Sequence, residues 1–218
     1  MRLYVFDAYG TLFDVHAAAE RQKDSIGPKW KELSLIWRAK HLEYTWVYSL
    51  AGKQAMFWML AQRSLDLAIS EVGGGISTDV RARLLASYRT MDPYPEVREV
   101  LSVLKARGDK LAILSNGDAD MLTEAVRGAK LEGIFDAVIS VVSAGIFKPS
   151  PKVYQLVVGR FGIAPAEVAF HSSNRWDIAG AKAFGLRTVW VNRTAAPDEY
   201  PDLPPDHTVS DLRALLQG

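Results

Sequence analysis

Residues 3–12 read Leu-Tyr-Val-Phe-Asp-Ala-Tyr-Gly-Thr-Leu, an apolar run that ends at the carboxylate of Asp7 and turns at a Gly-Thr pair. Apolar runs of this length that stop at polar residues are typical of buried parallel strands. Further strands are expected at 110–115, 137–140, 168–172 and 187–191, and helices at about 95–107, 118–129, 150–161 and 176–184. This alternation predicts an α/β fold, a Rossmann-like core with a doubly wound parallel sheet.

Residues 15–91 interrupt the alternation, because they carry only helical patterns. We interpret them as an all-helical cap subdomain inserted after the first strand, into a core formed by residues 1–14 and 92–218. A helix is expected from about 28 to 48, and one stripe of it is interpreted as cap core or subunit interface. The members of that stripe are Trp30, Leu33, Trp37, Tyr44 and Val47.

Charge and composition exclude several functions. The 26 basic and 25 acidic residues leave a net charge of +1, without the basic block that a nucleic-acid partner would require. The chain has no cysteine, which excludes disulfides, thiolate nucleophiles and cysteine-ligated metals. The N-terminal residues do not resemble a signal peptide, and no apolar run approaches the roughly 20 residues of a membrane span. We expect a cytoplasmic protein with no membrane or nucleic-acid partner.

Polar side chains follow the predicted strands at the edge where such sheets bind ligands. Asp7 can act as a nucleophile that forms a covalent ester. The segment Ser115-Asn116-Gly117, the lysine of Lys148-Pro149, and residues 172–177 can hold an anion. Taken singly, each also has an ordinary interpretation as a turn residue, a helix cap or a solvated charge.

Taken together and in this order, these residues resemble the haloacid dehalogenase superfamily over the whole chain. Phosphatases of that superfamily generally carry a second aspartate where this chain has Tyr9, and a Gly-Asp pair where it has Ser172 and Ser173. A Mg²⁺ ion would therefore lack hard oxygen ligands. A Mg-dependent small-molecule phosphatase is therefore a disfavoured alternative function. A catalytically idle scaffold protein with the same fold is a further alternative.

The same departures resemble the L-2-haloacid dehalogenase family within the superfamily. The matching blocks are Asp-Ala-Tyr-Gly-Thr-Leu at 7–12, Trp-Arg-Ala-Lys-His-Leu-Glu-Tyr-Thr-Trp at 37–46, 115–117, Lys148-Pro149 with Tyr154, and 172–174 with Asp177. The resemblance implies hydrolysis of short-chain (S)-2-haloacids to (R)-2-hydroxy acids through an ester of Asp7, with inversion and with no metal or other cofactor. It also favours a homodimer. Ala39 departs from the longer polar residue that is common beside Arg38, which leaves pocket size and halogen preference open.

Charge compensation assigns roles within this resemblance. A carboxylate nucleophile and a carboxylate substrate repel each other by about 4 kcal/mol at about 4 Å, so two cations, Arg38 and Lys148, are needed. The expected catalytic residues are Asp7, which attacks; Lys148, which keeps Asp7 ionised; Asp177, Ser172 and Asn174, which orient water with Lys148; and Arg38, which receives halide with Asn116. The expected binding residues are Thr11, Ser115 and the amides of Ala8 and Tyr9 for the substrate carboxylate; Tyr9, Leu42, Phe57 and Trp176 as apolar walls; and Tyr154.

Overall fold

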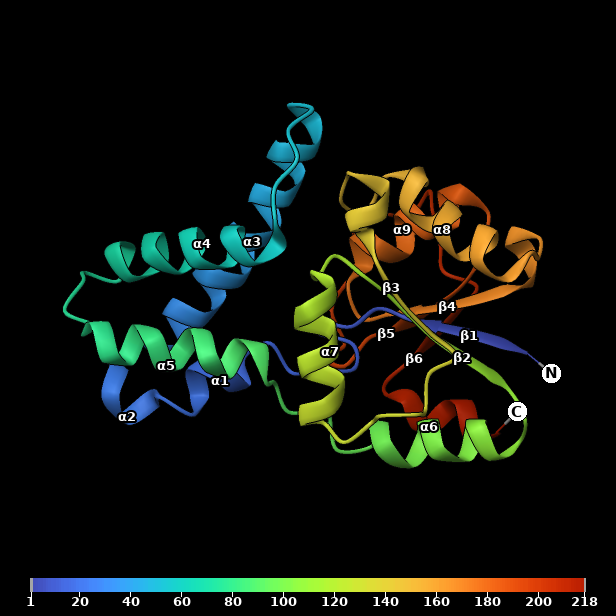
Figure 1. The fold of residues 1–218 in the computed structure, drawn as a ribbon, viewed down its shortest axis with the longest axis horizontal. Helices are drawn as coiled ribbons and strands as arrows, with labels where there is room; N and C mark the ends of the chain where they lie inside the picture. Colours follow the sequence, from blue (N-terminus) through green and yellow to red (C-terminus); the bar gives the residue numbers. More distant parts are fainter. Residues whose placement is uncertain (1, 218) are drawn as a thin grey trace.

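The computed structural model describes residues 2–217 and contains one six-stranded, fully parallel sheet (Figure 1). The strand order is β3-β2-β1-β4-β5-β6. The strands are β1 (Leu3–Phe6), β2 (Lys110–Ser115), β3 (Ala137–Ser140), β4 (Val168–Ser172), β5 (Arg187–Val191) and β6 (His207–Val209). The chain winds outward from β1 in both directions, which confirms the doubly wound Rossmann-like core.

Strand β1 lies at the centre of the sheet because it can be buried on both faces. Its four residues are all buried, and it pairs with β2 through Leu3 and Lys110 and with β4 through Phe6 and His171. The strands β1, β2 and β4 therefore end at the same edge, with Asp7, Asn116 and the residues after Ser172 next to one another. Asp7 itself donates its amide to the carbonyl of His171 at 2.9 Å.

Helices cover both faces of this sheet. In Figure 1, α8 and α9 lie above it and α6 lies below it, while α7 packs against β3. The core helices are α6 (Val97–Ala106), α7 (Ala119–Gly128), α8 (Pro151–Phe161) and α9 (Arg175–Phe184), and short 3-10 helices are η1 (Val141–Ala144), η2 (Pro165–Glu167) and η3 (Leu212–Gln217). All four α-helices coincide with the predicted segments to within about two residues.

The remaining helices stand together on one side of the sheet, at the left of Figure 1. They are α1 (Ala17–Glu20), α2 (Lys23–Ile26), α3 (Trp30–Leu50), α4 (Phe57–Glu71) and α5 (Thr78–Arg89). All five fall inside the predicted helical insert, whose exact limits stay a prediction. The two chain segments that join this group to the core run side by side, since Asp14 N donates to Asp92 O and Tyr94 N donates to Leu12 O.

The stripe predicted on α3 as cap core or subunit interface divides between a buried part and an exposed part. Leu33 and Trp37 are buried as expected, but Val47 is 53% exposed and Tyr44 is only half-buried. The buried face instead continues through His41 and Thr45. A four-residue step from position 37 keeps these side chains on the face that packs against α4, whereas position 47 has rotated away from it.

Strand β6 is not predicted by the sequence pattern. Its three residues are exposed or half-buried, so they carry no apolar run that would mark a buried strand. The segment 195–206 before it is the surface loop that its proline and acidic residues predict. None of the helices within residues 2–217 is both long and apolar enough to cross a membrane.

Candidate active site

The carboxylate of Asp7 lies at the end of β1 and is held by three side-chain donors. Its Oδ1 atom accepts a hydrogen bond from Lys148 Nζ at 3.0 Å. Its Oδ2 atom accepts from Thr11 Oγ1 at 3.0 Å and from Asn174 Nδ2 at 2.8 Å. The residue is only 5% exposed. Donors on both oxygens fix the direction of the carboxylate and stabilise its negative charge.

Lys148 lies between two carboxylates and is 1% exposed. Its Nζ atom is 3.0 Å from Asp7 Oδ1 and 2.8 Å from Asp177 Oδ2. Burial by itself would lower the pKa of Lys148, but the charges of Asp177 and Asp7 more than offset that effect, so its pKa is raised. The side chain is therefore an ammonium at neutral pH. Lys148 is thus not the solvated surface charge that a lone lysine usually is.

Asp177 is buried in the first turn of α9. Its Oδ1 atom accepts from the Tyr154 hydroxyl at 2.8 Å, and its Oδ2 atom accepts from Lys148. Burial raises the pKa of Asp177 to about 6, against the opposing effect of the Lys148 charge. A carboxylate with such a pKa can take up and release a proton near neutrality.

A small cavity of about 10 Å³ lies beside Asp7, which is room for about one water molecule. The core and the cap both line it, through Asp7, Tyr9, Asn116, Asn174 and Trp176 from the core and Arg38, Leu42 and Phe57 from the cap. The arrangement of α3 and α4 over Asp7 is therefore a closed one.

Arg38 brings a second cation to the cavity from the cap. Its Nη2 atom donates to the carbonyl of Tyr9 at 3.0 Å and to Asn174 Oδ1 at 3.2 Å. Its Nη1 atom is buried and has no acceptor among residues 2–217. A buried guanidinium nitrogen without an acceptor is costly, and an anion in the cavity would satisfy it.

The two serines of the predicted site bond to the main chain. Ser115 Oγ accepts from the amide of Gly117 at 3.1 Å, and Ser172 Oγ accepts from the amide of Asn174 at 3.1 Å. Both hydroxyls are buried and shape the loops that carry Asn116 and Asn174. Asn116 also holds the main chain of the lysine loop, because its Oδ1 atom accepts from Lys148 N at 3.0 Å.

The turn after Asp7 presents free amides at the same edge. The N–H groups of Ala8 and Tyr9 have no hydrogen-bond acceptor within the described chain, residues 2–217. Gly10 has a φ of 93°, a left-handed conformation that glycine adopts without strain. The tight turn predicted from the Gly-Thr pair is therefore present, and its amides are available to an anion.

Comparison with known proteins gives a consistent family. A family model described as haloacid dehalogenase-like hydrolase matches residues 1–185. The chain is 45% identical over 217 residues to (S)-2-haloacid dehalogenase 1 of Pseudomonas sp. (strain CBS-3), with 100% of this chain and 96% of that protein covered. The chain belongs to the L-2-haloacid dehalogenase family. The hydrolase class expected from the sequence is confirmed.

Solved structures agree with this membership. A crystal structure of a dehalogenase, 40% identical, matches with a TM-score of 0.97 and covers 100% of this chain and 96% of that one. The L-2-haloacid dehalogenase of Xanthobacter autotrophicus with chloropropionic acid covalently bound is 35% identical, with a TM-score of 0.86, and the match covers 100% of this chain and 97% of that one. The dehalogenase-type fold is thus preserved over the full described chain.

Sequence reasoning misses two residues around the candidate site, His41 and Asp118. His41 is buried on α3, where its Nε2 atom lies 3.0 Å from the carbonyl of Phe57 and its Nδ1 atom 3.1 Å from the Tyr88 hydroxyl. Burial lowers the pKa of His41 to about 3, and the charge of Arg38 adds to the effect. The imidazole is therefore neutral, with its proton on Nε2. Its place one turn from Arg38, in the block 37–46, is the only sequence signal for it.

Asp118 is the second of these residues. The sequence pattern gives it only as the start of the helix expected at 118–129, yet its side chain makes no capping bond to α7. Its two oxygens accept instead from the amides of Phe57 and Trp58 in the cap, at 3.1 and 2.8 Å. Main-chain partners in another part of the chain leave no trace in the sequence, so this contact cannot be predicted.

Proposed function

We propose that this protein converts short-chain (S)-2-haloacids into (R)-2-hydroxy acids and halide, without a cofactor, through an ester formed on Asp7. The observation that carries the proposal is the pair of cations around one buried carboxylate. Lys148 bonds Asp7 directly, and Arg38 closes the same cavity from the cap. An anionic nucleophile requires such compensation to meet an anionic substrate. The relative named (S)-2-haloacid dehalogenase and the structure with covalently bound chloropropionic acid support the substrate class.

Ester formation is the first step. One carboxylate oxygen of Asp7 attacks carbon 2 from the side opposite the halogen, and the carbon–halogen electron pair leaves with the halide. The configuration at carbon 2 therefore inverts. Arg38, whose Nη1 atom lacks an acceptor in the described chain, receives the halide together with Asn116. These donors act where negative charge develops as the bond breaks, so they lower the barrier rather than only bind substrate.

Hydrolysis of the ester is the second step. Water adds to the carbonyl carbon of Asp7, and the bond from that carbon to the substrate oxygen breaks. One proton of the water ends on the product hydroxyl and the other leaves to solvent. Asp177, with its raised pKa, accepts a proton from the attacking water. Lys148 and Asn174 stabilise the oxygen atoms of Asp7 during this step, since both already bond them.

Substrate binding involves the turn after Asp7 and the apolar walls. The free amides of Ala8 and Tyr9, with Ser115, hold the substrate carboxylate, while Thr11 donates to Asp7 and keeps that carboxylate in place. Leu42, Phe57 and Trp176 line the cavity and limit the alkyl group to a short chain. Tyr154 acts through Asp177, whose carboxylate it bonds.

The phosphatase alternative has weaker support from this site. An ammonium group, that of Lys148, lies between the carboxylates Asp7 and Asp177. The ammonium charge offsets part of the negative charge of this pair, which weakens its attraction for a divalent cation. A phenol, Tyr9, stands where the general acid of a superfamily phosphatase is expected.

Isotope transfer tests the proposed ester. In a single turnover of (S)-2-chloropropionate in ¹⁸O-water, with enzyme in excess and EDTA present, we expect ¹⁸O in the peptide that contains Asp7 and unlabelled lactate. Mass spectrometry of both products provides the measurement, and Asp7→Asn should release no chloride. Label in the lactate formed in this single turnover would mean direct attack by water on carbon 2. Release of chloride from the (R) enantiomer alone would overturn the proposed stereochemistry.

We also propose a homodimer, and the cytoplasmic location stays a prediction. Large apolar side chains are exposed at the end of α3, in the loop that follows it and in η1, namely Val47, Leu50, Met56 and Val142. In Figure 1 this end of α3 stands away from the other helices. An exposed apolar surface of this kind is typical of a subunit contact. Leu50→Glu should shift a dimer to monomer in analytical ultracentrifugation, and a monomeric wild type would refute the assignment.

A further inference from the structure

The first turn of α4 forms part of the wall of the catalytic cavity, but no side chain at its own N-cap position accepts from its first amides. The helix begins at Phe57, and the preceding residue, Met56, has the extended backbone of an N-cap residue but no oxygen in its side chain. The first N–H groups of a helix have no acceptor within the helix and need one from elsewhere. The amides of Phe57 and Trp58 are such groups.

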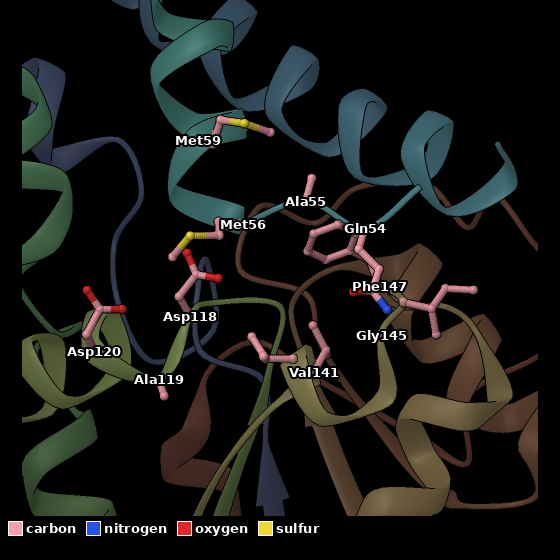
Figure 2. Close-up of a pocket in the computed structure, with 12 residues that line it drawn as sticks. Gln54, Ala55, Met56, Met59, Asp118, Ala119, Asp120, Val141, Gly145 and Phe147 are labelled. Atoms are coloured by element: carbon pink, nitrogen blue, oxygen red, sulfur yellow. The ribbon is translucent and has the colours of Figure 1, made fainter. Parts of the chain in front are cut away.

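The missing acceptor comes from the core. The carboxylate of Asp118, which follows β2, accepts from Phe57 N at 3.1 Å through Oδ1 and from Trp58 N at 2.8 Å through Oδ2. In Figure 2 the Asp118 carboxylate points toward Met56 at the start of this helix. Asp118 is 3% exposed, and its negative charge also faces the positive end of the helix dipole.

Hydrogen bonds and shared helices link this contact to the residues that line the cavity. Phe57 lies in the cavity wall, and its carbonyl accepts from the Nε2 atom of His41. His41 belongs to the same helix as Arg38, one turn further along. A shift of the first turn of α4 would therefore move Phe57 directly and the face of α3 that carries Arg38 through His41.

We propose that Asp118 is a positioning residue, which seats the closed cap on the core by capping α4 and thereby places Phe57 and Arg38 around the substrate. The inference rests on the proposed dehalogenase function, because closure matters only if chemistry takes place in the enclosed cavity. When the cap opens to admit substrate, the two amides exchange Asp118 for water. Re-formation of the contact selects the closed arrangement.

The primary test compares Asp118→Ala with Asp118→Asn. Alanine removes both acceptors, whereas asparagine keeps one neutral oxygen. For (S)-2-chloropropionate we expect kcat/KM to fall on the order of tenfold in Asp118→Ala and by less in Asp118→Asn. Hydrogen exchange, followed by mass spectrometry, should become faster in the peptide that starts α4, while peptides from β1 and β4 keep their wild-type rates.

Asp120 offers a matched control for charge. Asp118 and Asp120 both line a surface cleft, which Figure 2 shows, but the carboxylate of Asp120 bonds the side chain of Arg89 at the end of α5 rather than the main chain of α4. Asp120→Asn removes the same negative charge from the cleft. We expect its kcat/KM and the exchange of the α4 peptide to stay within about twofold of wild type, as is usual for an exposed pair.

A second variant distinguishes the attachment of α4 to the core from the stability of α4 itself. Met56→Ser supplies an N-cap within α4 itself. Added to Asp118→Ala, it should restore the exchange protection of the α4 peptide while kcat/KM stays low, because the tie to the core is still absent. Recovery of both would show that Asp118 only stabilises the helix, and would overturn the proposal.

Two further outcomes are decisive. Wild-type kcat/KM and wild-type α4 exchange in Asp118→Ala would overturn the positioning role. A wild-type protein without any dehalogenase activity would instead refute the proposed function, whereas the exchange measurements would still report whether Asp118 holds α4. Failure of the inference and failure of the proposed function are therefore distinguishable.

Discussion

The Nζ atom of Lys148 lies 3.0 Å from Oδ1 of Asp7, although 141 residues separate the two in the chain. The same atom lies 2.8 Å from Oδ2 of Asp177. A single buried ammonium group therefore compensates two buried carboxylates. This relationship links the stability of the core to the proposed chemistry, because the cation that keeps the buried charges together also holds the nucleophile.

Replacement of Lys148 by methionine should abolish turnover and destabilise the fold. The change leaves Asp7 and Asp177 buried without their cation, which costs about 3–5 kcal/mol. Chemical denaturation monitored by circular dichroism measures the loss. The double variant Lys148→Met with Asp177→Asn should recover part of this stability but no activity. Wild-type stability in Lys148→Met would contradict the central role given to this pair.

Arg38→Met tests the proposed halide contact. Removal of a donor from a developing negative charge costs about 10²–10³ in kcat. We expect a greater loss with 2-chloropropionate than with 2-bromopropionate, because chloride is the poorer leaving group and depends more on stabilisation. Arg63 on the cap surface serves as control, and Arg63→Met should leave both rates unchanged. Equal losses with the two halides would place Arg38 elsewhere in the mechanism.

Trp176→Ala should broaden the range of substrates. Trp176 lines the catalytic cavity and also an apolar cleft of about 690 Å³. Its ring packs edge-on against the ring of Trp46, and the two ring centres are 5.6 Å apart. Truncation would join the two spaces. Relative to 2-chloropropionate, kcat/KM for 2-chlorohexanoate should rise on the order of tenfold. Phe184→Ala, on the same cleft, provides the control. An unchanged ratio would show that another wall limits the chain length.

His41→Gln should change how stability depends on pH. Burial lowers the pKa of His41 in the folded protein to about 3, so between that value and about 6.5 only the unfolded chain binds a proton there. Stability from this group is therefore lost as pH falls below about 6.5, by up to about 1.4 kcal/mol per pH unit.

Glutamine cannot take up this proton and can still donate to Phe57 O and accept from the Tyr88 hydroxyl. Between pH 6.5 and 4 the wild type should lose about 3 kcal/mol more stability than His41→Gln. Urea unfolding at a series of pH values measures the difference. The exposed His207 is the control, and His207→Gln should keep the wild-type slope. Parallel slopes for wild type and His41→Gln would exclude a buried neutral imidazole.

Much of the core fold can be predicted from the sequence. The strands 110–115, 137–140, 168–172 and 187–191 have the predicted bounds, because each is a short apolar run, although β3 at the edge of the sheet is only half-buried or exposed. Strand β6 lacks such a run and escapes prediction. The periodicity of α3 shows which residues share a face, but it does not show where a neighbouring helix ends. For that reason the sequence does not separate the buried Trp37 from the exposed Val47 on the predicted stripe.

The candidate site divides in the same way. Residues that carry chemistry, such as Asp7 and Lys148, are visible because few residue types can do their work and their order along the chain resembles a family. Asp118 and His41 stay hidden because their partners include main-chain atoms, which every residue type shares.

The sequence by itself determined the strands and helices, the family and the chemical groups, since these follow from local backbone geometry and from side-chain identity. Only the tertiary structure decided which carboxylate oxygen of Asp7 faces Lys148 and that Arg38 keeps a nitrogen without an acceptor in residues 2–217. It also decided that the carboxylate of Asp118, in the core, accepts from the first amides of α4. Such contacts depend on the free energy of burial summed over the whole molecule, in which every buried charge and amide must find a partner at once.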